Sequence, residues 1–348
     1  FEDFGSGDPL KLERGAVVSK MLASGCWPMI RQRPYNVIAN PADEPKAIFV
    51  SGFDSAPLAP DSNVLVKEEG AAFQTGLNAL TRMTTGKVYL NLRNGVKNSE
   101  VFTNAKNVEI SLFEGPHPAG NVGTQIAQIS PINKGEIIWH VSPADVIIIG
   151  RLFLTGKYDA RKIVALTGSE VAKPGYFKLI SGSCIKSLVS TNAKSTGYRV
   201  ISGNVLTGVR LASQCSLGFY DTQITVIPEG NHYEFLGWAM PRLDKHSFSK
   251  SYFAWLMPGR KFVLDTNLNG GVRALVMTGE YEKVFPFDIY PMHLLKAIIN
   301  KDIDGMEQLG IYEVVEEDFA LCEYIDTSKT EIQTIVREGL DMLRAEMS

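Results

Sequence analysis

The chain has 348 residues, of which 45% are hydrophobic and 21% charged, with a formal net charge of −3 and a sequence pI of about 6.0. A chain of this length can bury two or three separate cores. The charge balance lacks the clustered basic patch that nucleic acid or an anionic membrane surface requires, so we predict no nucleic-acid partner. No apolar run approaches the roughly 20 residues of a membrane-spanning helix, so we predict no transmembrane segment.

The cysteines and the first residue bear on where the chain works. Cys26, Cys184, Cys215 and Cys322 are far apart and form no C-x-x-C pair. This spacing argues against a disulfide framework and against a local thiolate metal site, and it favours a reducing, cytoplasmic compartment. Because the chain starts at Phe1 without a methionine or a secretory leader, we expect it to be a fragment of a longer protein.

The first third of the chain alternates between helical and strand patterns. Asp8 followed by Pro9 is typical of the start of a helix. Apolar spacing predicts helices at 9–25, 66–86 and 99–105, and strands at 47–50, 88–92 and 108–113. Strands that alternate with helices indicate an α/β fold with a parallel, Rossmann-like sheet, which we assign to residues 1–155.

Further along the chain the pattern changes to short strands separated by glycine turns. We expect strands at 163–166, 176–180, 199–201 and 223–227, and an irregular stretch with some strand at 233–279. Residues 156–279 are therefore assigned to a small mixed or mostly β module. Apolar stripes predict helices at 292–299 and 331–347, within a helical domain at 280–348.

The residues at 115–124 form the most informative stretch, because three glycines, two prolines and one histidine follow a predicted strand. Glycine permits positive φ and close backbone approach, whereas proline fixes φ and removes a donor. A stiff loop that presents His117 after a strand is where α/β proteins often place function. The alternative is a tight turn in which His117 only satisfies local hydrogen bonds.

These residues carry a resemblance to a known family. The run Glu-Gly-Pro-His-Pro-Ala-Gly-Asn-Val-Gly-Thr at 114–124 resembles the signature loop of the NqrA subunits of the Na⁺-translocating NADH:quinone reductases. The other matching stretches are Leu-Ala-Ser-Gly-Cys-Trp at 22–27, Phe-Val-Ser-Gly-Phe-Asp at 49–54, Thr-Gly-Ser-Glu at 167–170 and Glu-Asp-Phe-Ala-Leu-Cys at 317–322. The resemblance covers the whole chain and begins after that family's N-terminal biotinyl/lipoyl-like region.

Membership of this family implies a peripheral subunit on the cytoplasmic face of the bacterial inner membrane. Its implied partners are the other subunits of the complex, especially the membrane subunits, and ubiquinone is a further candidate. The complex passes electrons from NADH through FAD, FMN and iron–sulfur groups on other subunits to ubiquinone and drives Na⁺ outward. This chain would contribute to assembly and to the quinone-reduction end. The resemblance also implies that residues 162–227 form a β-grasp, soluble-ligand-binding (SLBB) module.

More distant relatives, RnfC and the flavin-binding subunit of complex I, bind FMN, NADH and iron–sulfur clusters. Their flavin phosphate lies in a glycine-rich cradle, because backbone N–H groups must converge on the anion. The corresponding residues 25–35 carry bulky side chains and two prolines here. The relatives' acidic loop reads Gly-Phe-Asp-Ser-Ala-Pro at 52–57, which keeps Asp54 and has Ala56 at the second acidic place. We therefore predict no flavin in this chain.

The cysteine ligands of the relatives' iron–sulfur clusters are also missing, because a cubane cluster needs four cysteines at fixed spacing. The places of the ligands are taken by Glu280, Lys283, Pro286 and Tyr290, and in a second copy by Glu316, Phe319, Cys322 and Asp326. Only Cys322 among them could bind iron, and we interpret it as a small buried residue. The C-terminal domain is expected to be a helical, ferredoxin-like scaffold without clusters. We assign no catalytic, cofactor-binding or metal-binding residue to the chain.

Other histidines and an aromatic group leave alternatives open. His140, His232, His246 and His293 have no partner at a ligand spacing, so we interpret them as surface or capping residues. Five aromatic residues gather in one segment and indicate a core or a subunit interface, with a quinone pocket as the alternative. They are Trp238, Phe248, Tyr252, Phe253 and Trp255.

The candidate quinone or partner site is the loop residues His117, Pro118, Gly120, Gly123 and Thr124. The two glycines would leave room for a partner chain or a planar quinone headgroup to approach. A neutral imidazole could donate to a quinone carbonyl, and a protonated one could stabilise developing negative charge. Two other functions remain open: a stand-alone flavin-dependent NADH dehydrogenase, and a small-ligand-binding module without a redox role.

Overall fold

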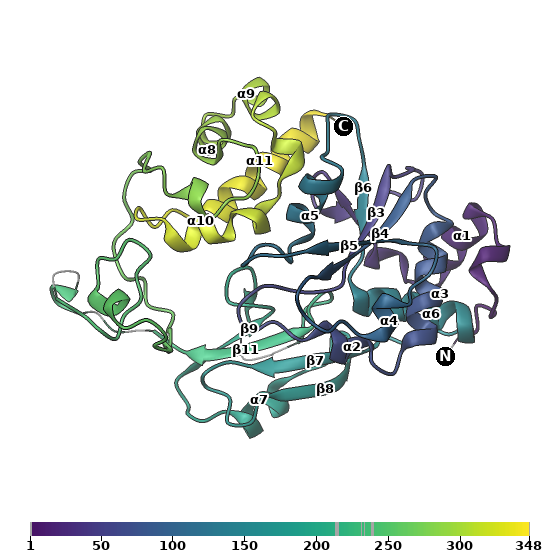
Figure 1. Cartoon of the computed structure of the whole chain (residues 1–348), viewed down its shortest axis with the longest axis horizontal. Coiled ribbons are helices and arrows are strands. Elements are labelled where there is room, and N and C mark those ends of the chain that lie inside the picture. Colours follow the sequence, from purple (N-terminus) through teal and green to yellow (C-terminus); the bar gives the residue numbers. More distant parts are fainter. Residues whose placement is uncertain (1, 213–215, 231, 233, 238–239, 348) are drawn as a thin grey trace.

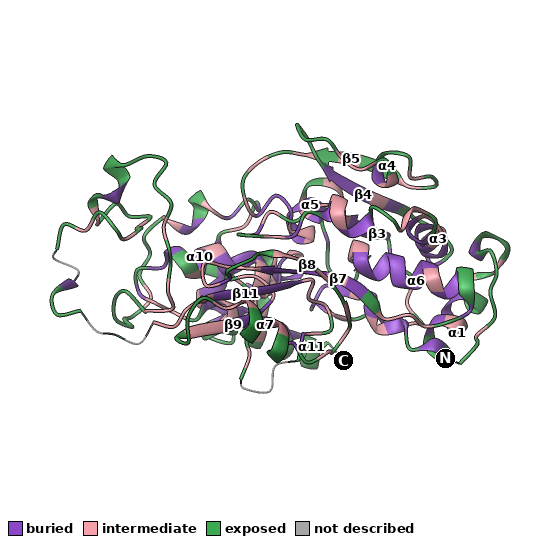
Figure 2. Cartoon of the chain, turned by 90° about the horizontal axis from the view of Figure 1, so that it is seen from below, coloured by how far each residue is buried: buried purple, intermediate pink, exposed green. Residues whose placement is uncertain are grey.

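The structure is a computed structural model and describes residues 2–212, 216–230, 232, 234–237 and 240–347. Two sheets and a helical C-terminal segment make up the molecule, and an irregular segment between β11 and the last helices projects to one side (Figure 1). Buried residues are concentrated in strands β3, β4 and β11 and in helix α6 (Figure 2). Cys215 lies outside the described residues.

The first sheet is mostly parallel, with the strand order β2-β1-β6-β3-β4-β5. Its central strands are buried on both sides, as in other sheets with helices on each face. Strands β6, β3, β4 and β5 run parallel, and β1 is antiparallel to both β6 and β2. The strands are β1 (Arg31–Arg33), β2 (Val37–Ile38), β3 (Ala47–Ser51), β4 (Lys87–Arg93), β5 (Glu109–Phe113) and β6 (Ile138–His140).

Helices α1, α3 and α6 cover one face of this sheet and enclose a core with strands β3 and β4. Helices α3 and α6 approach closely because glycines face each other: a Cβ on Gly76 would overlap the backbone of Val146, and one on Gly150 that of Ala72. Ser142 caps α6, where its Oγ accepts from the Asp145 N–H at 3.2 Å. The helices of this part are α1 (Arg14–Ser24), α2 (Ser62–Val66), α3 (Gly70–Thr81), α4 (Glu100–Thr103), α5 (Val122–Ile129) and α6 (Pro143–Thr155).

The opposite face of the sheet is covered by α5 and by the C-terminal helices (Figure 1). Phe49 and Ile138 of the sheet share one apolar core with Leu295, Leu340 and other residues of the last seventy positions. The C-terminal segment is thus one layer of the α/β sandwich. Its helices are α8 (Pro291–Ile299), α9 (Ile303–Gln308), α10 (Ala320–Ile325) and α11 (Ile332–Glu346), with the 3₁₀ turns η5 (Tyr281–Lys283), η6 (Ile311–Glu313) and η7 (Glu316–Phe319).

The second sheet is mixed, with the strand order β10-β9-β11-β7-β8, and has a core of its own. Strands β11 and β7 run parallel, and the remaining pairs are antiparallel. One short helix packs on it, which fits the expected β-grasp module. The elements are β7 (Arg161–Thr167), β8 (Gly175–Ile180), α7 (Lys186–Asn192), β9 (Tyr198–Ser202), β10 (Val209–Arg210) and β11 (Gln223–Pro228).

Several details differ from the expectations. The helix predicted at 9–25 is the 3₁₀ turn η1 (Pro9–Lys11) followed by α1, and the helix predicted at 66–86 is α3 alone, preceded by the separate helix α2. Beyond the end of α3, Thr84 Oγ1 donates to the Pro45 carbonyl at 2.7 Å. The described residues of 233–279 contain no strand, and they include the 3₁₀ turn η4 (Phe253–Leu256). Among the described residues, no helix combines the length and apolar character needed to cross a bilayer.

Candidate functional site

The loop at 114–121 leaves strand β5 and folds back over the carboxyl end of β3, where α/β sheets commonly bind ligands. The bond between His117 and Pro118 is cis, and Gly115 has φ of 136°. Three contacts fix the loop on the segment after β3. The Gly120 N–H donates to Ser55 Oγ at 2.8 Å, Ser55 Oγ lies 3.0 Å from His117 Nδ1, and Ser51 Oγ donates to the Gly120 carbonyl at 3.0 Å.

These contacts hold the His117 ring. Ser55 Oγ accepts from the Gly120 N–H at 2.8 Å and lies within hydrogen-bond distance of His117 Nδ1, so the hydroxyl ties the imidazole to the loop. Partial burial lowers the pKa of His117, although the charge of Glu317 opposes that shift. Burial therefore favours the neutral imidazole, whose Nδ1 side is held by the turn.

Buried polar side chains support the loop from below. Asn91 Nδ2 donates to Gln125 Oε1 at 2.8 Å, and Gln125 Nε2 donates to Ser51 Oγ at 2.8 Å. Asn91 and Gln125 are fully buried, so the chain of hydrogen bonds ties α5 to strands β3 and β4 in a low-dielectric interior. Thr124 is also buried, and its Oγ1 has no hydrogen-bond partner among the described residues.

A buried ion pair lies directly under the second half of the loop. Arg33 of strand β1 is fully buried and donates from Nη1 to Asp318 Oδ2 at 2.8 Å and from Nη2 to Glu317 Oε1 at 2.6 Å. Burial raises the pKa of Asp318 to about 6 against the opposing charge of Arg33. A Cβ on Gly123 would stand 2.5 Å from Arg33 Nη1 and from Asp318 Oδ1, so only glycine fits here without displacement.

The room at both loop glycines is thus filled by the chain itself. We expected Gly120 and Gly123 to leave space for a partner or a quinone, but Ser55 occupies that space at Gly120 and Arg33 with Asp318 occupies it at Gly123. His117 itself is half-buried. Two cavities of about 240 and 700 Å³ lie elsewhere, the first against β9 and the second between α1 and β8, and neither includes a residue of 114–124.

Three of the family-like stretches meet at this site. Residues 49–54, 114–124 and 317–322 are far apart in sequence, yet Ser51 contacts Gly120 and Asp318 lies against Gly123, which brings them together. Arg33 and the carboxylates Glu317 and Asp318 were not predicted as site residues. The signal available was an arginine inside an apolar segment, which alone does not identify its partner.

Part of the segment 25–35 is packed into the protein core. Trp27, Met29 and Ile30 are buried in the core of the first sheet, and Trp27 Nε1 donates to the Ala39 carbonyl at 2.7 Å. Bulky buried side chains thus stand where a phosphate cradle needs small residues.

The residues that align with the relatives' cluster ligands make ion-pair and packing contacts instead. Glu280 and Lys283 form an ion pair of 2.7 Å, and Phe319 packs on Phe285 with 4.6 Å between ring centroids. Burial raises the pKa of the Cys322 thiol to about 12, so it stays a neutral thiol. The described residues contain no group of three or more ligand-type side chains that could hold a metal ion.

The remaining histidines differ in their surroundings. His140 ends strand β6 with a buried, unpaired Nε2, and burial together with Arg31 and Arg33 lowers its pKa well below the usual value. The interpretation of His140 as a surface or capping residue is therefore wrong, because its Nε2 is buried without a hydrogen-bond partner among the described residues. His246 Nδ1 lies 3.0 Å from the Tyr324 hydroxyl, His232 lies 3.7 Å from Asp265, and His293 is exposed.

The aromatic residues of 238–255 do not form a core. Phe248, Phe253 and Trp255 are exposed and Tyr252 is half-buried. Neither cavity includes them. The core interpretation is wrong for the exposed three, and Trp238 lies outside the described residues.

The architecture is that of an α/β protein with a parallel sheet joined to a β-grasp module. A solved NAD⁺-reducing [NiFe]-hydrogenase in the H₂-reduced state contains a chain of similar fold, with a TM-score of 0.50 and 14% identity over 97% of this chain and 62% of that chain. This likeness concerns the fold alone.

Sequence comparisons identify the family. Residues 12–158 match the NqrA second alpha/beta domain, and residues 163–213 match the NQRA C-terminal domain. The NqrA subunit of the Na(+)-translocating NADH-quinone reductase of Rhodopirellula baltica is 38% identical over 97% of this chain and 74% of its own length. That of Vibrio anguillarum is 37% identical over 99% of this chain and 77% of its own length. The chain belongs to the NqrA family, whose members are subunits of Na⁺-translocating NADH:quinone reductases.

Proposed function

We propose that this chain works as a peripheral subunit of a Na⁺-translocating NADH:quinone reductase, on the cytoplasmic face of the bacterial inner membrane. Membership of the NqrA family over nearly the full length carries this proposal. The chain contributes to assembly with the membrane subunits, while NADH, FAD, FMN and iron–sulfur groups are bound by other subunits. The filled flavin segment at Trp27 and Met29 and the buried thiol of Cys322 support a chain without its own cofactor.

We further propose that the loop contacts ubiquinone at the quinone-reduction end through His117, while Pro118, Gly120, Gly123 and Thr124 hold the loop from beneath. Ser55 lies against Nδ1 of the ring, and we propose the tautomer with the proton on Nε2, which can donate to a carbonyl oxygen of ubiquinone. The lowered pKa keeps this donor in the neutral form at pH 7. Gly123 and Thr124 act below the surface, where they let α5 close over the Arg33 ion pair.

Two isosteric substitutions test the role of His117 in the assembled complex. His117→Asn keeps an acceptor near Nδ1 for Ser55 and loses the outer donor, whereas His117→Gln keeps an N–H near the position of Nε2 and weakens the tie to Ser55. We expect His117→Asn to slow quinone reduction by about 10²-fold, the lower end of general acid–base contributions, and His117→Gln to recover part of the loss. NADH oxidation with a soluble artificial acceptor should not change in either variant.

If His117→Asn reduced quinone faster than His117→Gln, the role of His117 would be limited to holding the turn. In that case His117→Asn would show normal quinone turnover, and His117→Gln would lower the melting temperature of the chain. A stoichiometric flavin absorbance band in the purified chain would instead support the stand-alone NADH dehydrogenase and overturn the proposed function.

A further inference from the structure

The segment at 240–277, called the arm here, exposes an unusual amount of apolar surface. Monomeric proteins rarely leave large contiguous apolar patches in water unless the patch binds a partner. The arm leaves the second sheet after β11 and returns to the C-terminal helices, and both views show it projecting from the two sheets (Figures 1 and 2). Its exposed large hydrophobic residues are Met240, Leu243, Phe248, Phe253, Trp255, Leu256, Met257, Val263, Leu264, Leu268, Val272, Val276 and Met277.

Hydrogen bonds fix the base of the arm at two places. Near the second sheet, the Gly230 N–H donates to Thr266 Oγ1 at 2.8 Å. Near the C-terminal helices, the Arg273 N–H donates to the Ser328 carbonyl at 2.8 Å, and Ser328 Oγ donates to the Ala274 carbonyl at 2.9 Å. Both anchors lie in the last part of the arm, which is therefore attached there to packed parts of the molecule.

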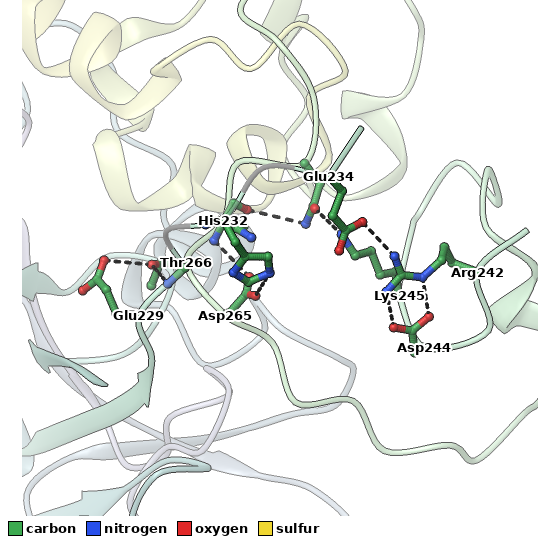
Figure 3. A network of polar contacts seen from close by, with 11 residues as sticks. Glu229, His232, Glu234, Arg242, Asp244, Lys245, Asp265 and Thr266 are labelled. Atoms are coloured by element: carbon green, nitrogen blue, oxygen red, sulfur yellow. Dashed lines mark hydrogen bonds and ion pairs between the residues drawn. The ribbon is translucent and has the colours of Figure 1, made fainter. Parts of the chain in front are cut away.

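A polar network joins the first part of the arm to Glu234, which precedes it, and to Asn269 near its end (Figure 3). Glu234 accepts from Arg242 at 2.7 Å and from Lys245 at 2.9 Å, and Arg242 also pairs with Asp244. Lys245 Nζ donates further to Asn269 Oδ1 at 2.9 Å. Each exposed ion pair stabilises little alone. Together they join the first and last parts of the arm, which prearranges its surface for a partner of fixed shape.

The charged side chains in the middle of the arm are all basic. Residues 246–264 contain no Asp or Glu, whereas the whole chain has a net charge of −3. Lys250, Arg260 and Lys261 are exposed, and the described part of the chain offers them no ion-pair partner. These cations flank the turn η4, which presents Phe253 and Trp255 to solvent.

We propose that the arm is the surface by which this chain docks on another subunit of the same reductase, on a face that is apolar and bordered by carboxylates. This inference rests on the proposed function. Exposed aromatic and basic side chains are the residue types that dominate binding energy at protein interfaces. The spread of apolar residues along the arm and its fixed shape favour a protein partner over a lipid surface, which requires no complementary shape.

Two arm variants and two matched controls test the proposal. The arm variants are Trp255→Ser/Leu256→Ser and Lys250→Glu/Arg260→Glu/Lys261→Glu. The controls change equally exposed residues elsewhere: Leu154→Ser/Val209→Ser and Lys106→Glu/Lys173→Glu/Lys178→Glu. Each is expressed with all other subunits and purified through a tag on this chain. We expect the arm variants to retain about tenfold less of the other subunits than the wild type, as for loss of an interface anchor.

The possible outcomes distinguish failure of the proposed docking surface from failure of the proposed function. Thermal unfolding of each isolated variant should match the wild type, because the changed side chains are exposed. Equal recovery of the other subunits by arm variants and wild type would overturn the docking surface. Normal assembly combined with lost binding to phosphatidylglycerol vesicles would overturn it in favour of a lipid contact. A wild-type chain that recovers no reductase subunit would contradict the proposed function instead.

Discussion

At the scale of single residues, Gly123 decides whether the loop can close over the buried charges. Its missing side chain leaves the space in which Arg33 and Asp318 meet, and a methyl group there would stand within 2.5 Å of both. The two charged groups cannot move toward water, because Arg33 and Asp318 are both buried. One glycine thus joins the conformation of the loop to the stability of the ion pair.

We expect Gly123→Ala to destabilise the chain by roughly 1–3 kcal/mol, the usual cost of overpacking a core. The matched control is Gly15→Ala in α1, where a Cβ would meet nothing within 4 Å. That change should stabilise the chain by about 0.5–1 kcal/mol, because alanine is the better helix former. Chemical denaturation measures both, and equal effects of the two substitutions would contradict the proposed crowding at Gly123.

At the scale of elements, the ion pair joins the short strand β1 to the turn η7 of the C-terminal segment. Asp318 Oδ2 also accepts from the Val315 N–H at 2.9 Å, which holds η7 in place. A buried ion pair is costly to form, because both charges lose their hydration. Removing either partner would leave the other charge buried without compensation, which strongly destabilises the fold. The pair therefore defines where η7 sits on the sheet.

A double-mutant cycle tests this account. We expect Asp318→Ala to destabilise the chain by roughly 3–5 kcal/mol, because it leaves Arg33 buried with only the partly exposed Glu317. Arg33→Met in the same chain should restore a large part of the loss, since no uncompensated charge remains. Urea denaturation of the four proteins gives the coupling energy. Additive effects of the two substitutions would show that the pair does not hold η7.

Several elements with a clear apolar period were predicted, but the long apolar helix α6 and several short elements were missed. Apolar runs predicted β3, β4, β5 and the C-terminal helices α8 and α11. Strands β1 and β2 have only two or three residues, so they carry no period and were missed. His117 was predictable because a strand and stiff residues surround it. Arg33 and Asp318 are separated by 285 positions, and only the fold brings them together.

At the scale of the whole molecule, the cores do not follow the expected domain boundaries. The sequence indicated separate domains at 1–155 and 280–348, yet Phe49 of β3 and Leu340 of α11 lie in one apolar core. The second sheet keeps its own core around Val226. Proteins open locally in roughly contiguous cooperative units. Because strand β3 and the last helices share one core, we expect them to open together, and we expect the second sheet with its own core to open separately.

Hydrogen exchange with two matched core substitutions tests this division. Leu340→Ala and Val226→Ala each remove a fully buried branched side chain, and the former should cost roughly 2–5 kcal/mol. We expect Leu340→Ala to lower the protection of the β3 amides at 47–51, although these lie far from it in sequence, and to leave the β9 amides at 198–202 unchanged. Val226→Ala should have the opposite pattern. Loss of protection limited to 280–347 in Leu340→Ala would show that the C-terminal helices unfold alone, as the expected domain boundary implies.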